Sequence, residues 1–327
     1  MFWLPDRLRE VHPPARRWDI DRRTRIRDDL CHGSQLRHGD RETIIRLNWW
    51  CDEYGLDTIS AGGVIGFVME LFERGLIDAA QLDGIQPRFG DRSAALALME
   101  KMAKVEGCGE WLAQGVASVA AEFPEAAPFA MHVKGLEMPA YHPNAAKGTA
   151  LAYAVSERGA CHLRGAPLGE LFSGAADPLA IEGKAQLFRD HQADKAVWDS
   201  ACLCYFPGYG MKLKELWQLV VAATGFEYPA VSDLERVGER ISTLARSFNV
   251  REGFSRAHDT LPTRNLVQPL AGGPGGGQVV ELAPMLDEYY RLMGWDANGV
   301  PTPERLKLLG LDAVIFPEKG VRAQPDS

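Results

Sequence analysis

Helical periodicity is the feature that most constrains what this sequence can fold into. From residue 42 onward, apolar residues recur at every third or fourth position, so that one segment after another carries an apolar stripe along one helix face. In the segment 91–105, for example, Leu96, Met99 and Met102 lie three positions apart. The strict alternation that marks a half-buried strand is almost absent. The sequence therefore predicts a mainly α-helical protein, with further helices at 107–122, 145–156, 186–201, 211–224, 231–247 and 283–293.

The helical pattern is interrupted in two places. Residues 1–40 contain nine arginines, no lysine and no sustained apolar period, which predicts a divergent, poorly ordered leader. The proline-containing stretch 124–128 cannot continue a helix, and residues 134–139 read as an extended or turning connection. A chain of 327 residues is long enough for two domains. We therefore expect one helical domain at 41–135 and a second at 136–327.

Charge and cysteine content exclude several classes of protein. The 36 Lys and Arg residues are outnumbered by 44 Asp and Glu residues, so the chain lacks the basic surplus that binds nucleic acid. No apolar run reaches the roughly 20 residues that cross a bilayer, and the amino terminus lacks the apolar stretch of a secretory signal. Six cysteines are too few for a disulfide scaffold, and Cys202 with Cys204 lacks the second ligand pair of a zinc site. We expect a cytoplasmic protein with no nucleic-acid or membrane partner, in which Cys51, Cys108 and Cys161 are buried.

Two short segments share one outline. Residues 52–57 read Asp-Glu-Tyr-Gly-Leu-Asp, and residues 199–204 read Asp-Ser-Ala-Cys-Leu-Cys. Each follows a helix-like stretch and predicts a turn whose backbone N–H groups and carboxylate can meet a polar heterocycle. A six-residue match with three free positions is a weak pattern by itself. On the spacing alone, Asp57 is most simply a helix cap and Gly55 a turn residue.

These segments belong to a series of blocks that resembles the aldehyde:ferredoxin oxidoreductase family. The resemblance covers about residues 40–312 and corresponds to domains 2 and 3 of that family, without its amino-terminal β-rich domain. It implies two mostly helical domains. The blocks are Cys-Asp-Glu-Tyr-Gly-Leu-Asp-Thr-Ile-Ser at 51–60, Lys-Gly-Leu-Glu-Met-Pro-Ala-Tyr at 134–141, the stretch 146–164 ending in Gly-Ala-Cys-His-Leu-Arg, Phe-Asn-Val-Arg-Glu-Gly-Phe at 248–254 with Asp-Thr-Leu-Pro at 259–262, and Met-Leu-Asp-Glu-Tyr-Tyr at 285–290 with Gly-Trp at 294–295.

The resemblance implies a tungsten, occasionally molybdenum, ion held by two pterins beside a 4Fe–4S cluster. Such an enzyme oxidises an aldehyde to a carboxylic acid and passes the electrons to ferredoxin, with the chemistry supplied by the cofactor. His162 matches the family's histidine near the metal, where an imidazole can donate a hydrogen bond or move a proton. Cys204 matches the fourth ligand of the cluster. The positions that match the family's pterin-binding residues are Asp52, Gly55, Leu56, Asp57, Asp199 and Leu203.

The sequence departs from the family pattern in three respects. Cys202 stands where the second pterin segment usually has glycine, which permits positive φ or a close backbone approach. The family's other three cluster cysteines form a Cys-x-x-Cys-x-x-x-Cys run upstream, but Cys31 is the only cysteine within residues 1–50. The family's catalytic-site glutamate is expected at 24–27, where this chain reads Thr-Arg-Ile-Arg.

These departures leave three interpretations of the chain open. In the first, the chain is a truncated oxidoreductase. In the second, it is the carboxy-terminal subunit of a two-chain enzyme whose amino-terminal subunit is separately encoded. In the third, it is a non-catalytic remnant that binds no metal. The partners that follow are ferredoxin, an aldehyde substrate, the separate subunit, and a second copy of the chain in a homodimer. The first interpretation is our leading one.

Overall fold

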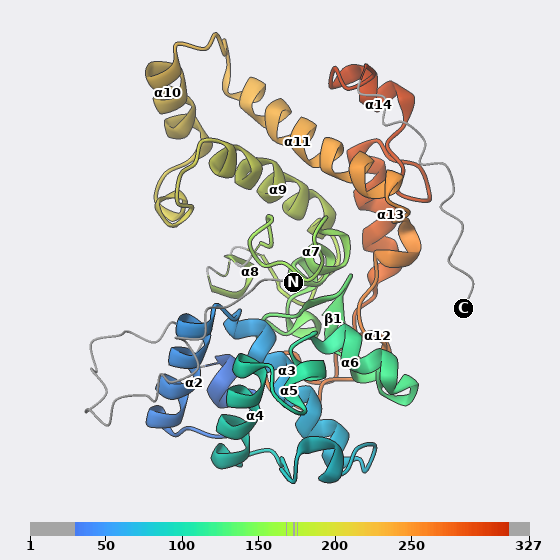
Figure 1. Ribbon diagram of the computed structural model, residues 1–327. Coiled ribbons are helices and arrows are strands. Elements are labelled where there is room, and N and C mark those ends of the chain that lie inside the picture. Colours follow the sequence, from blue (N-terminus) through green and yellow to red (C-terminus); the bar gives the residue numbers. More distant parts are fainter. Residues whose placement is uncertain (1–29, 168, 173, 175, 314–327) are drawn as a thin grey trace.

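The structure is a computed structural model, and it describes residues 30–167, 169–172, 174 and 176–313. The described residues are mainly helical, which confirms the predicted fold class. Figure 1 shows the helices in two groups, with α2 to α5 below and α7, α9, α10, α11 and α13 above. No helix among the described residues is long and apolar enough to span a bilayer.

The first group of helices follows a single π-helical turn at Leu30–Ser34. The helix predicted at 91–105 is confirmed as α4, whereas the segment 107–122 forms two short helices instead of one. The helix is interrupted at Gly115, and the N–H of Val116 donates to the Glu137 carboxylate at 2.7 Å instead of to a helical carbonyl. The helices of this group are α2 (Arg41–Tyr54), α3 (Thr58–Glu73), α4 (Arg92–Lys104), α5 (Gly109–Leu112) and α6 (Val116–Glu122).

The expected leader at 1–40 is packed in its last part. Residues 1–29 lie outside the described residues. Cys31, His32 and Leu36 are completely buried, next to α2 and α3. Ordered packing therefore begins before residue 40. The sequence did not indicate this, because isolated apolar side chains in an arginine-rich segment contribute to a core without showing a helical period.

The second group of helices begins after a two-stranded antiparallel ribbon. Strand β1 (His132–Val133) pairs with β2 (Leu136–Glu137), and α7 starts ten residues after the ribbon ends. Every residue of α7 is buried, and α9 packs against α7, α11 and α13. The helices of this group are α7 (Lys147–Val155), α8 (Gly169–Phe172), α9 (Lys184–Ser200), α10 (Leu213–Thr224), α11 (Val231–Arg251), α12 (Thr263–Val267), α13 (Leu282–Met293) and α14 (Pro303–Leu308).

Buried apolar side chains form two large cores. The first core draws on residues from Leu36 to Ala130, and the second on residues from Val133 to Trp295. A third, small cluster lies where α9, α10 and α11 meet, and consists of Val197, Trp198, Leu216 and Leu234. We propose that the two large cores belong to the two domains expected at 41–135 and 136–327.

Two polar contacts join the groups. Glu137, which follows the first core in the chain, accepts hydrogen bonds from the Ser60 hydroxyl at 2.7 Å and from the first N–H of α6. Arg264 on α12 forms a two-pronged hydrogen-bonded ion pair with Glu70 on α3, 194 positions away in the sequence. The two groups are thus fixed to each other at both ends of α3.

Candidate functional site

The two sequence segments with a common outline form the same backbone turn. At the end of α2, the N–H of Leu56 donates to the carbonyl of Cys51 at 2.9 Å. At the end of α9, the N–H of Leu203 donates to the carbonyl of Trp198 at 3.2 Å. Both bonds reach back five residues, as in a helix-terminating Schellman turn. We call residues 51–57 the first turn and residues 198–204 the second turn.

Each turn needs one residue in the left-handed region. Gly55 supplies it in the first turn with φ 70°, and no side chain is strained there. Cys202 supplies it in the second turn with φ 57°. The backbone conformation that glycine would adopt is therefore kept by a cysteine, at a cost on the order of 1 kcal/mol.

The first turn presents two carboxylates. Asp57 caps α3 by accepting the N–H of Ser60 at 2.9 Å, so the simple reading of this residue as a helix cap is correct at the level of local structure. Asp52 is exposed and accepts from the Asn48 amide at 3.2 Å. Leu56 packs against the first core. The carboxylates thus lie at the surface of a turn whose leucine anchors it.

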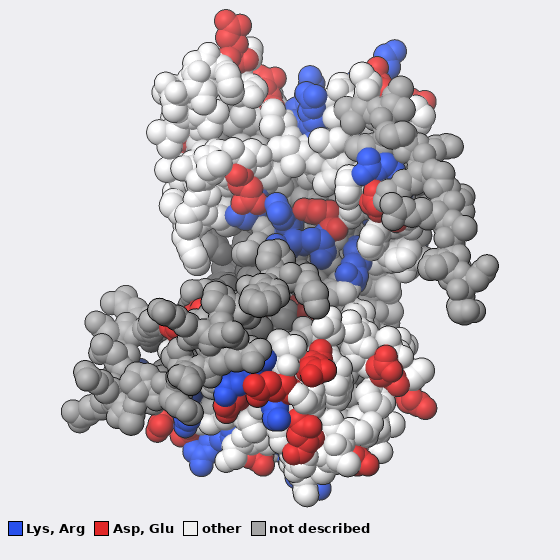
Figure 2. Space-filling model, in the orientation of Figure 1, with Lys and Arg blue, Asp and Glu red and all other residues white. Residues whose placement is uncertain are grey.

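The second turn is held by cations and exposes two thiols. Asp199 accepts from Lys195 at 2.8 Å and from Arg164 at 3.3 Å. Cys202 and Cys204 are both exposed, and Leu203 is 42% exposed. Figure 2 shows Lys and Arg side chains gathered where the upper helices face the lower ones, with Asp and Glu beside them.

The loop at 156–164, which we call the His162 loop, is bonded to the second turn and lies within the electrostatic influence of Asp57 in the first. The half-buried His162 ring lies with its centre 5.9 Å from that of Tyr141. Burial lowers the pKa of His162, Arg158 lowers it further, and the negative charge of Asp57 opposes both effects, so Asp57 acts on this ring from the first turn. At the other end of the loop, Arg164 reaches Asp199 of the second turn. The lowered pKa favours a neutral imidazole at His162 near pH 7.

The His162 loop is pressed onto the strand ribbon at Gly159. Its φ of 105° and its position leave no room for a side chain, because a Cβ there would lie 2.2 Å from the carbonyl oxygen of Val133. Cys161 is buried and its sulfur accepts the N–H of Leu163 at 3.3 Å. The burial predicted for Cys51, Cys108 and Cys161 is confirmed.

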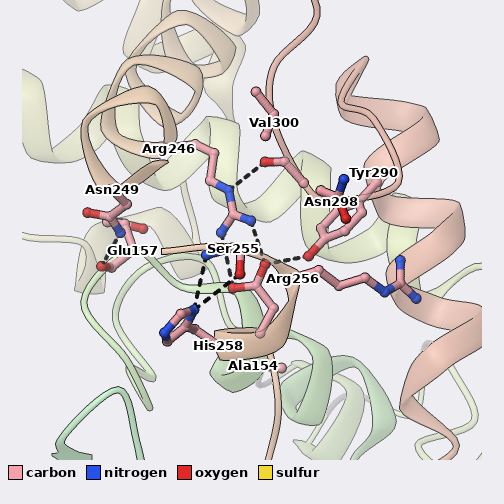
Figure 3. A network of polar contacts seen from close by, with 12 residues as sticks. Ala154, Glu157, Arg246, Asn249, Ser255, Arg256, His258, Tyr290, Asn298 and Val300 are labelled. Atoms are coloured by element: carbon pink, nitrogen blue, oxygen red, sulfur yellow. Dashed lines mark hydrogen bonds and ion pairs between the residues drawn. The ribbon is translucent and has the colours of Figure 1, made fainter. Parts of the chain in front are cut away.

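Buried charged residues behind the loop were not assigned a role from the sequence. Asp259 forms ion pairs of 2.8 Å with Lys134 and with Arg246, and accepts a hydrogen bond from the Tyr290 hydroxyl. We call these four residues the Asp259 cluster; Figure 3 shows Arg246 and Tyr290 pointing toward each other in it. Lys134, Asp259 and Tyr290 fall within the blocks that carry the family resemblance, which is the signal that could have drawn attention to them.

The described residues can contact a pterin but do not make a metal centre. No group of three or more His, Cys, Asp or Glu side chains within the described ranges is arranged to hold a metal ion. A 4Fe–4S cluster normally takes four cysteine thiolates, and the second turn offers Cys204 with Cys202 beside it. The two turns do supply the carboxylates and backbone groups that suit a polar heterocycle. The donor set therefore fits the pterins and supplies only part of what a cluster requires.

Two cavities lie away from the two turns. One of about 640 Å³ is lined by Asp259, Arg256 and apolar residues of α13. Another of about 620 Å³ lies between the groups, beside Glu70 and Arg264. Neither is lined by His162 or by the predicted pterin-binding residues. The candidate site is thus a surface formed by two turns and a loop.

Comparison with known sequences bears on this surface. A family model described as "Aldehyde ferredoxin oxidoreductase, domains 2 & 3" matches residues 29–311. The "Tungsten-containing aldehyde ferredoxin oxidoreductase" of Pyrococcus furiosus is 38% identical over 287 residues, which are 85% of this chain and 47% of that protein. The protein of the same description from Thermococcus kodakarensis is 37% identical over 287 residues, with the same coverage.

A more distant relative and a solved structure extend the comparison. The "Aliphatic sulfonate oxidoreductase, WOR-like subunit" of Pyrococcus furiosus is 29% identical over 297 residues, 85% of this chain and 44% of that protein. The structure of the active site complex BamBC of benzoyl coenzyme A reductase matches 89% of this chain and 49% of its own chain, with a TM-score of 0.70 and 20% identity, so it shares the fold. The chain spans about half the length of the curated relatives it matches.

Proposed function

Because the chain belongs to the aldehyde ferredoxin oxidoreductase family, we propose that it forms the helical part of a tungsten–pterin enzyme that oxidises an aldehyde to a carboxylic acid. One observation supports the proposal: two helix ends form the same backbone turn, and the loop that holds His162 is bonded to one turn and feels the charge of Asp57 in the other.

We assign the roles of the residues from the family resemblance. Asp52, Gly55, Leu56 and Asp57 of the first turn contact one pterin. Asp199 and Leu203 of the second turn contact the other, and Cys204 supplies one thiolate to a 4Fe–4S cluster that passes electrons to ferredoxin. The tungsten centre, when bound, supplies the two-electron oxidation of the substrate.

His162 acts on a substrate oxygen. Since burial keeps its pKa below the ordinary value, the ring is neutral at pH 7 and can donate one N–H while its other nitrogen accepts a proton. The Tyr141 ring lies beside it, with the two ring centres 5.9 Å apart. The ring can thus orient the oxygen and take up a proton as the carboxylic acid forms.

Metal quantification by mass spectrometry tests the proposal. The 327-residue chain is purified alone and after coexpression with its upstream coding sequence. We expect about one tungsten and about four irons per chain in the coexpressed sample, because the cluster needs cysteines beyond Cys204. The chain alone should carry fewer irons. An absence of tungsten and iron in both samples would support the metal-free remnant and reject the proposal.

A second candidate is supported by a specific comparison. One relative is described as a WOR-like subunit, and the matched structure is the complex BamBC. We therefore also consider this chain as the carboxy-terminal subunit of a two-chain oxidoreductase. Affinity purification of the chain from its native source tests this candidate: a co-purifying protein that brings tungsten with it supports a subunit, and a metal-loaded single chain contradicts it.

A further inference from the structure

The His162 loop begins at a helix end that is held by a buried lysine. Lys134, in the turn between β1 and β2, donates to the carbonyl of Ala154 at 2.6 Å and to that of Ser156 at 3.1 Å. These carbonyls end α7, where the last turn of a helix leaves acceptors without helical partners and carries partial negative charge. The lysine therefore satisfies the helix at the point where the loop leaves it.

A second contact holds the next residue of the loop. The side-chain amide of Asn249 on α11 donates to the carbonyl of Glu157 at 2.6 Å, and Figure 3 shows the two residues side by side. Together with Gly159, which touches Val133, three of the first four residues of the loop are held by the strand ribbon and by α11. His162 follows three positions later.

The Asp259 cluster keeps the lysine in place. The side chains of Lys134, Asp259 and Arg246 are 2%, 0% and 3% exposed, so all three charges are buried together. Arg246 also donates to the carbonyl of Gly299 at 2.7 Å. Two cations surround one carboxylate, and loss of Lys134 would leave a neutral, paired Arg246–Asp259 unit. Such a unit is tolerated in a protein interior, whereas an unpaired charge is not.

We propose that the Asp259 cluster, through Lys134 and with the help of Asn249, is the device that positions His162. It holds the start of the loop so that the imidazole stays half-buried beside Tyr141 and within the electrostatic influence of Asp57. Lys134 and Asn249 touch neither substrate nor cofactor and are positioning residues. The importance of His162 itself rests on the proposed function, but the mechanical link from the cluster to the loop does not.

Two variants remove the two contacts separately. Lys134→Met deletes the donor to Ala154 and Ser156, and Asn249→Ala deletes the donor to Glu157 without changing any charge. Lys147→Met is the matched control. This fully buried lysine begins α7, at the end opposite the His162 loop, and donates to the carbonyl of Val279. All three are made in the full 327-residue chain.

Hydrogen exchange and NMR titration of the metal-free chain supply the readouts. Both positioning variants should speed amide exchange at 157–164 about tenfold, since each removes a buried hydrogen bond that opposes local opening. They should also raise the pKa of His162 toward its ordinary value as the ring gains water. Its charged neighbours Arg158 and Asp57, and the adjacent Tyr141, are unchanged in every variant. The control should leave the exchange and the titration as in the parent chain.

If Lys134→Met does not fold, Asn249→Ala alone tests the proposal. Unchanged exchange at 157–164 and an unchanged His162 titration in Asn249→Ala would overturn the proposal, as would equal changes in the Lys147→Met control. Both readouts use metal-free protein, so they do not depend on whether the chain binds tungsten. A failed metal analysis and a failed loop analysis are thereby told apart.

Discussion

Cys202 and Gly55 occupy equivalent positions in two turns, yet only one of them is suited to its backbone. Cys202 has φ 57° and Gly55 has φ 70°, both in the left-handed region. A side chain at such a φ crowds the backbone, whereas glycine lacks the atom that causes the crowding. The second turn thus retains a conformation that its own sequence disfavours.

Replacement of Cys202 by glycine should therefore stabilise the chain. We expect Cys202→Gly to raise the free energy of unfolding by about 0.5–1 kcal/mol, since relief of strain exceeds the added freedom of the unfolded chain. Urea denaturation measures the change. Val105→Gly is the comparison, because Val105 has φ 54° at the end of α4, far from the two turns. A destabilised Cys202→Gly together with a stabilised Val105→Gly would contradict the strain assigned to Cys202.

The thiol of Cys204 should affect iron and leave the fold intact. Cys204 is exposed, so Cys204→Ser should change the free energy of unfolding by less than about 0.5 kcal/mol. In metal-loaded enzyme it should lower the iron content, because serine is a poorer ligand than thiolate. Mass spectrometry of the loaded protein gives the iron content. Cys202→Gly should keep the iron at the parent level, and an equal loss in that variant would reject the assignment to Cys204.

His162→Ala should separate turnover from metal binding. The imidazole is expected to work on a substrate oxygen and not on the metal, so the variant should keep its tungsten while the rate of aldehyde oxidation falls at least about 100-fold. Metal analysis and a dye-linked assay of the same sample measure both quantities. Undiminished turnover with full tungsten occupancy would remove His162 from the mechanism.

Single residues were the scale at which the sequence was most informative. Asp57 reads as a helix cap in the sequence and caps α3 in the structure, because an N-cap depends only on neighbours three positions away. At Cys202 the structure shows positive φ, one of the two properties for which a glycine is expected at that position. The half-buried state of His162 did not follow, since its burial depends on Tyr141 and on a loop fixed by distant elements.

The ion pair between α3 and α12 is the strongest polar link between the two groups of helices. Glu70 accepts from both Arg264 and Arg74. Burial would raise the pKa of Glu70, but the hydrogen bonds and charges of the two arginines outweigh this and hold it below its ordinary value. The carboxylate therefore stays ionised and keeps both partners.

Removal of the arginine that crosses between the groups should cost more than removal of the local one. We expect Arg264→Met to lower the free energy of unfolding by about 2 kcal/mol, because it deletes two charge-assisted hydrogen bonds in a partly buried position. Arg74→Met removes a pair within one helix whose arginine side chain is 51% exposed, and should cost about 0.5 kcal/mol. Urea denaturation compares the two variants. Equal losses would mean that the inter-group pair adds nothing beyond its charge.

Helices were predictable as elements wherever their periodicity was uninterrupted. The segments 91–105 and 231–247 became α4 and α11 because an apolar stripe and a packing partner coincide there. The segment 107–122 split at Gly115, since Glu137 from a distant strand binds the backbone at the start of α6. Periodicity reports the stripe of a helix but not a competing acceptor from elsewhere in the chain.

Histidines with lowered pKa values contribute to the acid sensitivity of the whole molecule. Burial, assisted by His38, lowers the pKa of His32 to about 4, while Asp57 opposes the effect. Burial also lowers the pKa values of His38, His132, His142, His162 and His191. An unfolded histidine takes up a proton below pH 6.5 and these folded ones do so only at lower pH, so stability is full above pH 6.5 and is lost as the pH falls.

Acidification from pH 7.5 to 5 should therefore destabilise the chain, with His32 as the largest single contributor. His32→Gln should reduce the loss over this interval by about 2 kcal/mol, because glutamine does not titrate. Urea denaturation at the two pH values gives the difference. A slope that His32→Gln does not change would show that the buried ring is not the source.

Contacts between distant parts of the molecule were beyond the reach of the sequence. Arg264 and Glu70 are 194 positions apart, and the Asp259 cluster joins the strand ribbon, α11, the segment after it and α13. Each of these residues is an ordinary charged or polar residue in its local context. The resemblance marked several of their positions, but only the assembled fold shows which charges neutralise one another.

The uneven exposure of the cysteines gives the molecule a natural labelling site for thiol-reactive probes. Four thiols are sealed inside the protein, and the two that reach solvent, Cys202 and Cys204, sit on a single turn. A maleimide fluorophore added to the native chain would attach there without any engineered handle. A cysteine sulfur that is bound to iron resists alkylation. A lower fraction of dye at Cys204 would therefore indicate a higher fraction of chains that carry the cluster.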